Sequence, residues 1–240
     1  LDRSAYDLRL SSAGISLAGI RALADVGVTG TAALDLSGRG TFGDPRAEGR
    51  VAVTGIQVNQ RPAPDLRVHL ALRDQTARVR GRWGADLDGS YHLARKTFSA
   101  ALGFDRTDLA PYLRIAGLAD MGGRIDGSVT ARGRSDAPEQ IRVDADLRDL
   151  TLTTGDRELL STSRLAARME NRTVTVPDAE LRLLKEGRLT LGGRGSLAGR
   201  IDFTAAGRIP FSIIQPFLEY ESDAGGAILV DAGVGGNERS

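Results

Sequence analysis

Alternation of apolar and polar residues with a period of two is the strongest feature of this sequence. Between Leu66 and Arg73, for example, Leu66, Val68, Leu70 and Leu72 alternate with charged or small residues. Successive side chains of a β-strand point to opposite faces, so such a segment is apolar on one side and polar on the other. The pattern recurs along the chain between Gly, Asp, Asn and Pro turn signals, and it predicts about 16 strands.

The residues that we expect on the apolar sides of these strands are mostly Leu, Val and Ile. They are the candidate lining residues of a hydrophobic surface: Leu34, Leu36, Val51, Val53, Leu66, Val68, Leu70, Leu72, Val79, Val129, Ile141, Val143, Leu147, Leu181, Leu183, Leu189, Leu191, Ile201 and Phe203.

Three segments break the alternation and predict short helices. One lies near 17–24, where Ser16 is a good N-cap residue. The second lies near 109–115 and carries Pro111 in its first turn, where the missing N–H of proline matters little. The third surrounds Pro216.

The helices and glycines indicate an internal repeat. Three positions recur at a constant offset of 93 residues, namely Gly30, Gly40 and Pro45 against Gly123, Gly133 and Pro138. We therefore expect repeat units at 1–97 and 98–206 and the start of a third unit at 207–240. Neither end carries an obvious capping repeat, so the sequence predicts an interior part of a longer repetitive protein.

Composition and motifs favour no enzyme, metal or cofactor. The chain has 240 residues, a formal net charge of +1 and no cysteine, which argues against nucleic-acid binding and thiolate metal sites. His69 and His92 lie in strand-like segments, and His69 is expected on a polar side between arginines. Gly38 to Gly43 fits a GxGxxG motif, but Asp44-Pro45 and another strand follow instead of a helix, so we interpret it as a turn.

Alternation alone leaves two all-β architectures open. A closed β-sandwich buries the apolar sides of two sheets against each other. An open sheet leaves them accessible, and this is favoured by the repeats and by the low aromatic content of 5%.

Several segments together resemble the TamB family (translocation and assembly module subunit), related to AsmA-like proteins and the bridge-like lipid transfer group. The resemblance covers nearly the whole chain and rests on rhythm and turn placement, in Asp108–Leu113, Gly123–Val129, Asp136–Pro138, Gly207–Phe211, Pro216–Leu218 and Gly226–Leu229.

The resemblance implies a long, curved, repetitive sheet that forms an open hydrophobic trough (a β-taco) with short interposed helices. It also implies a periplasmic location in a diderm bacterium, with an inner-membrane anchor and membrane contact outside this segment. Expected partners are phospholipid acyl chains and, for the full-length protein, an Omp85-type outer-membrane protein. The implied function is phospholipid transport linked to outer-membrane biogenesis, and the alternative is a structural or chaperone-like scaffold for outer-membrane protein assembly.

Overall fold

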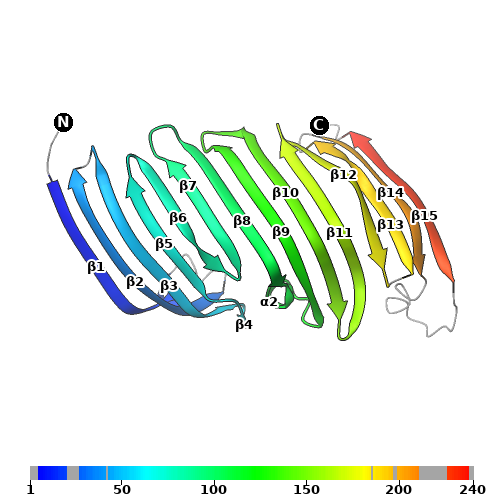
Figure 1. Ribbon diagram of the computed structural model, residues 1–240, viewed down its shortest axis with the longest axis horizontal. Coiled ribbons are helices and arrows are strands. Elements are labelled where there is room, and N and C mark those ends of the chain that lie inside the picture. Colours follow the sequence, from blue (N-terminus) through cyan, green and yellow to red (C-terminus); the bar gives the residue numbers. More distant parts are fainter. Residues whose placement is uncertain are drawn as a thin grey trace. The chain divides into compact units, whose positions relative to one another are not determined.

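The strands of this chain form one open antiparallel sheet (Figure 1). The computed structural model describes residues 5–20, 27–41, 43–184, 186–196, 199–210 and 226–237. Over these residues the sheet has 15 strands, in the order β1-β2-β3-β5-β6-β7-β8-β9-β10-β11-β12-β13-β14-β15, with β4 paired to β3. The prediction of an all-β fold built on one open sheet is confirmed.

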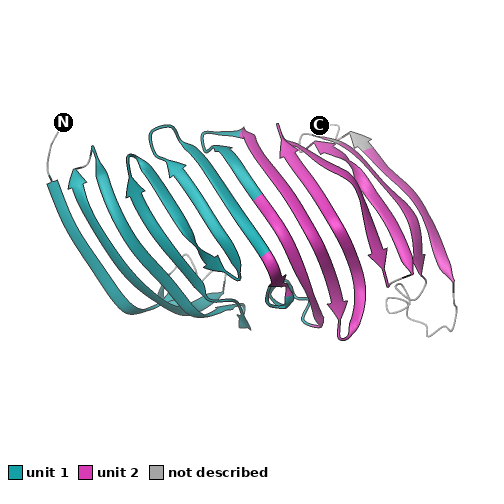
Figure 2. Ribbon diagram, in the orientation of Figure 1, with its two compact units in different colours: residues 1–104, 110–119, 130–138 teal, residues 105–109, 120–129, 139–240 magenta. Residues whose placement is uncertain are grey.

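The chain divides into two compact units, which Figure 2 shows in different colours. Unit 1 comprises residues 1–104, 110–119 and 130–138, and unit 2 comprises residues 105–109, 120–129 and 139–240. This division follows contacts and not sequence repetition, so the repeat boundaries after residues 97 and 206 stay a prediction.

Unit 1 contains the first strands of the sheet. Their bounds are β1 (Ala5–Ser16), β2 (Val28–Thr41), β3 (Pro45–Val58), β4 (Arg61–Pro62), β5 (Leu66–Arg73), β6 (Thr76–Trp83), β7 (Ala85–His92) and most of β8 (Thr97–Asp108). Unit 1 also contains the 3-10 turn η1 (Leu17–Gly19) and the helix α2 (Ala110–Ile115).

Unit 2 contains most of the remaining strands. Their bounds are β9 (Met121–Arg134), β10 (Ala137–Thr154), β11 (Arg157–Glu170), β12 (Thr173–Leu183), β13 (Gly187–Ser196), β14 (Arg200–Pro210) and β15 (Ala227–Asn237), with the end of β9 and the start of β10 in unit 1.

Tight turns set the register of these strands. The β5–β6 turn places Asp74 and Gln75 at φ values of 49° and 58°, and the β11–β12 turn places Asn171 and Arg172 at 49° and 59°. Two successive positive φ values define the turn whose twist matches a two-residue hairpin, and Asn and Asp tolerate this conformation better than most residues.

The helix predictions met different outcomes. The helix near 109–115 is confirmed as α2, with Pro111 in its first turn. The prediction for 17–24 is wrong where the structure describes it, because only the 3-10 turn Leu17–Gly19 forms and Ser16 makes no side-chain cap hydrogen bond. Residues 21–26 and the predicted helix around Pro216 lie outside the described residues.

The β-sandwich alternative is wrong for the described residues, because their strands belong to a single sheet and no second sheet packs against it. Burial agrees with this. No large side chain in the described ranges is less than 2% exposed, whereas two packed sheets would bury the side chains between them.

Candidate functional site

Cross-strand register brings the apolar residues of unit 1 into continuous rows. The row through Leu70 pairs it with Gly49 of β3 and Val79 of β6. Four such rows, which we call the apolar rows of unit 1, are Ile15-Ala32-Val53-Leu66-Trp83-Ala85, Ser12-Leu34-Val51-Val68-Gly81-Leu87-Leu102, Leu10-Leu36-Gly49-Leu70-Val79-Gly89-Ala100, and Leu8-Gly38-Ala47-Leu72-Ala77-Tyr91-Phe98.

Much of this surface is accessible to solvent. Leu8 is 58% exposed, Leu10 50%, Leu70 36% and Leu102 39%, and all four belong to the apolar rows of unit 1. Scattered exposed leucines are ordinary in a folded protein, whereas a contiguous apolar surface across many strands is uncommon and makes this surface the candidate site.

The glycines in the apolar rows leave space that neighbouring side chains fill. A Cβ on Gly49 would collide with the Leu36 side chain, and a Cβ on Gly81 would lie 2.7 Å from Cγ1 of Val68. The neighbouring side chains therefore lie across the glycine positions. The surface offers a low lining of aliphatic groups on which an extended hydrocarbon chain can lie flat.

The first of these rows, which contains Ala32 and Val53, is partly covered in a buried cluster. Leu17, Ala32, Val53 and Ile56 are each 7–8% exposed and pack together, with Val28 and other partly buried residues around them. Leu17 of η1 thus packs on β2 and β3 in the hydrophobic cluster described for unit 1.

Helix α2 is attached to β6 beside this cluster. The Tyr112 hydroxyl donates a hydrogen bond of 2.7 Å to the carbonyl oxygen of Trp83, and the Trp83 indole N–H donates one of 3.0 Å to the carbonyl oxygen of Pro64. The two rings meet edge to face at 5.9 Å. Arg61 donates to the carbonyl oxygen of Arg114, at 2.7 Å, near the end of the helix.

These contacts predict the effect of Tyr112→Phe. Loss of the hydrogen bond to Trp83 should lower the free energy of unfolding by about 0.5–1.5 kcal/mol. Amide hydrogen exchange of residues 110–115 should accelerate at the same time. Urea unfolding measures the first effect. Unchanged exchange in the helix would show that Tyr112 does not hold it.

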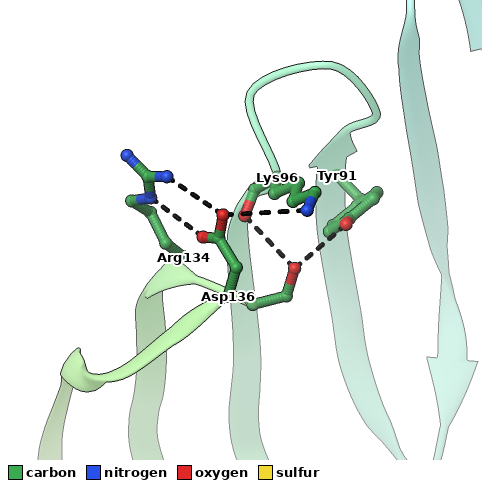
Figure 3. Close-up of polar contacts among 5 residues, drawn as sticks. Tyr91, Lys96, Arg134 and Asp136 are labelled. Carbon is green, nitrogen blue, oxygen red and sulfur yellow. Dashed lines mark hydrogen bonds and ion pairs between the residues drawn. The ribbon is translucent and has the colours of Figure 1, made fainter.

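Polar contacts form in the turns next to the fourth row, which contains Tyr91 (Figure 3). Tyr91 shares a hydrogen bond of 3.0 Å with the Ser135 hydroxyl, and the Ser135 N–H donates to the carbonyl oxygen of Lys96. Asp136 accepts hydrogen bonds from Arg134 and lies 3.9 Å from Lys96. The hydrogen bonds from Arg134 hold the pKa of Asp136 below its usual value. The apolar rows are thus bounded at the fourth row by the loops that follow β7 and β9.

Unit 2 carries apolar rows of the same kind. Val143 pairs with Met169, which pairs with Val174. Further strands extend these rows as Val174-Gly195-Ile201-Gly236, Val176-Gly193-Phe203-Val234, Ala179-Leu191-Ala205-Ala232, Leu181-Leu189-Gly207-Val230 and Leu152-Leu160-Leu183-Gly187. Here too Ile201 and Val234 are exposed, at 45% and 63%.

The register gives the positions of most of the candidate lining residues. Those of unit 1 up to Val79 lie in its apolar rows. Val143, Leu181, Leu183, Leu189, Leu191, Ile201 and Phe203 lie in the rows of unit 2, and Leu147 faces Leu165. Ile141 lies in β10 two residues before Val143, on the same side of that strand, and Val129 lies in β9. Their role as a lipid lining stays a prediction.

Sequence reasoning missed the contribution of β7 and β8. Leu87, Tyr91, Phe98 and Leu102 complete the rows, but their strands alternate weakly because glycine and alanine occupy intervening apolar positions such as Gly89. The cross-strand register identifies these residues as members of the rows. It places Gly89 directly opposite Val79, and thereby Leu87 and Tyr91 opposite Gly81 and Ala77.

The opposite side of the sheet is charged. His69 lies there, exposed and directly across from Arg50 and Arg80, as its neighbours in sequence indicated. In unit 2, Asp144 accepts hydrogen bonds from Arg142 at 2.9 Å and from Arg168 of β11 at 2.6 Å. These bonds stabilise the carboxylate and lower the pKa of Asp144.

The Asp144 contacts predict a pH dependence. Because the pKa of Asp144 is lower in the folded chain than in the unfolded chain, its contribution to stability is present above the unfolded value and is lost as pH falls through the folded value. Asp144→Asn should lower stability at neutral pH and reduce the loss of stability on acidification. Thermal unfolding between neutral and acidic pH measures both effects. Parallel pH profiles for variant and parent would contradict the assignment.

The described residues lack two other features. They contain no group of three or more His, Cys, Asp or Glu side chains that could hold a metal ion. None of their helices has the length and apolar character needed to cross a membrane.

Comparison with known proteins gave no match. No family model, curated protein or solved structure matches this chain. The function therefore has to be argued from the geometry of the sheet itself.

Proposed function

We propose that this chain is a non-catalytic segment of a lipid conduit, in which phospholipid acyl chains lie on the apolar rows. The observation that carries the proposal is the register of unit 1, which places apolar or small side chains opposite one another from β1 to β8. The TamB resemblance supports the same function and suggests a periplasmic location, phospholipid transport between the two membranes and an Omp85-type partner for the full-length protein.

The dimensions suit an acyl chain. The four rows span Leu66 to Leu72 along β5, and at about 3.3 Å per residue this is roughly 20 Å. A bilayer core of about 30 Å contains two layers of chains, so one chain needs about half that thickness. The apolar surface along one strand is therefore long enough to cover a single lipid tail.

The energetics favour movement along the rows. Each buried methylene contributes about 0.8 kcal/mol, so transfer of a tail from water to the sheet is strongly favourable. Neighbouring strands present apolar or small residues in each row, so a tail that passes from one strand to the next stays in contact with a largely apolar surface. No covalent chemistry is required.

Bound lipid is the first test. Purification of the chain in a mild detergent, followed by native mass spectrometry and lipid extraction, should recover phospholipid. The polar-side variant Ala71→Asp should keep the lipid. A protein that stays lipid-free after reconstitution with phospholipid would contradict the proposal.

A scaffold that accepts client strands is the alternative, and one observation favours it. Among the described strands, β1 and β15 each pair with one other strand, so their second sides can accept a strand either from elsewhere in a longer chain or from a client. An unpaired strand side presents backbone N–H and C=O groups that can bind an extended peptide. Crosslinks from β1 or β15 to unfolded outer-membrane proteins, without crosslinks from the apolar rows to lipid, would favour this function.

A further inference from the structure

A row of three arginines crosses unit 2 on the charged side of the sheet. Arg182 of β12 faces Arg188 of β13, and Arg188 faces Arg208 of β14. All three are exposed. Adjacent strands lie about 4.8 Å apart, so the backbones that carry these guanidinium groups are close neighbours.

This arrangement is unfavourable for the isolated sheet. Like charges directly opposite each other on neighbouring strands are destabilising. Among the described residues, no carboxylate oxygen lies within 4.0 Å of a guanidinium nitrogen of this row. Glu180, two residues before Arg182, and Asp231 of β15 lie on the same side, but neither forms an ion pair with it.

Elsewhere the same side of the sheet pairs opposite charges across strands. Arg80 lies 2.6 Å from Asp88 across β6 and β7, and Arg164 lies 2.9 Å from Asp146 across β10 and β11. Arg67 also faces Arg82, and Arg148 faces Arg164, but Arg82 and Arg164 each form an ion pair with an aspartate. The row of Arg182, Arg188 and Arg208, which we call the arginine row, forms no such pair among the described residues. An anionic partner would reduce the repulsion within this row.

An exposed leucine extends the arginine row. Leu229 of β15 faces Arg208 directly and is 83% exposed, the most exposed of the large hydrophobic side chains described. Neither a free phosphate ion nor the backbone of a nucleic acid offers a hydrocarbon surface that an apolar side chain beside the cations could contact. A phospholipid surface offers phosphates to the guanidinium groups and hydrocarbon to the leucine.

We propose that the arginine row and Leu229 form a contact surface for the headgroups of an anionic phospholipid bilayer. It lies on the side of the sheet opposite the apolar rows, so it binds different lipid molecules from those proposed to lie on the rows. The net charge of +1 conceals such a surface, because the 31 acidic residues of the chain nearly balance its 32 basic residues.

Vesicle cosedimentation tests the proposal. The chain should bind phosphatidylcholine vesicles that contain phosphatidylglycerol more tightly than vesicles of phosphatidylcholine alone. A basic residue near an anionic surface contributes about 1 kcal/mol, so the triple variant R182Q/R188Q/R208Q should bind roughly 100-fold more weakly. Leu229→Ser should weaken binding by a smaller factor.

A matched variant controls for net charge. R80Q/R164Q/R168Q removes three arginines from the charged sides of the two units, each of them already paired with an aspartate. It should retain most of the vesicle binding. An equal loss in both triple variants would overturn the proposal, as would displacement of the vesicles by millimolar inorganic phosphate at constant ionic strength.

Charge reversal at Arg188 distinguishes a role of the arginine row in membrane binding from a role in stabilising the sheet. Arg188→Glu places a carboxylate between two arginines and should raise the melting temperature by about 1–4 °C while vesicle binding falls. Unchanged vesicle binding in this variant would overturn the proposal. All arginine-row variants should still take up acyl chains on the apolar rows, so failure here is distinguishable from failure of the conduit function.

Discussion

Leu70→Asp should weaken acyl-chain binding roughly 100-fold while the chain still folds. Leu70 lies in the middle of its apolar row, between Gly49 and Val79, and is 36% exposed. A carboxylate there loses the leucine contact with hydrocarbon and has to be desolvated when a lipid tail covers it. Together these effects cost about 3 kcal/mol or more, which corresponds to a roughly 100-fold loss of affinity. Binding of a fluorescent phospholipid measures it.

Ala71→Asp is the matched control. Ala71 is the next residue of β5 and faces the charged side, between Glu48 and Arg78. The same carboxylate should leave lipid affinity within a factor of about two there, because surface substitutions have small effects. Equal losses in the two variants would mean that the apolar side has no special role in binding.

Ile56→Ala should cause the largest loss of stability. Ile56 is 7% exposed in the cluster with Leu17, Ala32 and Val53. Removal of its outer carbons leaves a cavity at the only well-buried cluster described in unit 1, and such a change costs about 2–4 kcal/mol. Chemical unfolding followed by circular dichroism measures the free energy of unfolding.

Leu8→Ala provides the comparison for this variant. Leu8 is equally apolar but 58% exposed, so its truncation should cost less than about 0.5 kcal/mol. A cost for Leu8→Ala similar to that for Ile56→Ala would show that the apolar rows, and not the buried cluster, stabilise the sheet.

The alternation in the sequence was sufficient to predict the fold class and one side of most strands. Leu66, Val68, Leu70 and Leu72 alternate strictly, and a strand has only two sides on which to place them. The choice between an open sheet and a sandwich depended on packing between strands distant in sequence, which alternation does not encode.

The rest of the site depended on register and local hydrogen bonding. Gly81 interrupts the apolar pattern of β6, yet it faces Val68 and completes a row. Near Ser16 the helical spacing was misleading, because Ile15 pairs with Ala32 and Leu17 packs into the cluster of Val53 and Ile56, so tertiary contacts hold this segment as a strand and a 3-10 turn. The arginine row was invisible for the same reason, since its members come from three strands.

Photocrosslinking along β5 tests the central claim most directly. A photoreactive residue placed in turn at each position from Leu66 to Arg73 should form phospholipid adducts with a period of two, at 66, 68, 70 and 72 and not at the intervening positions. Adducts of equal yield at odd and even positions, or adducts at none, would contradict a function in which hydrocarbon chains lie on the apolar rows.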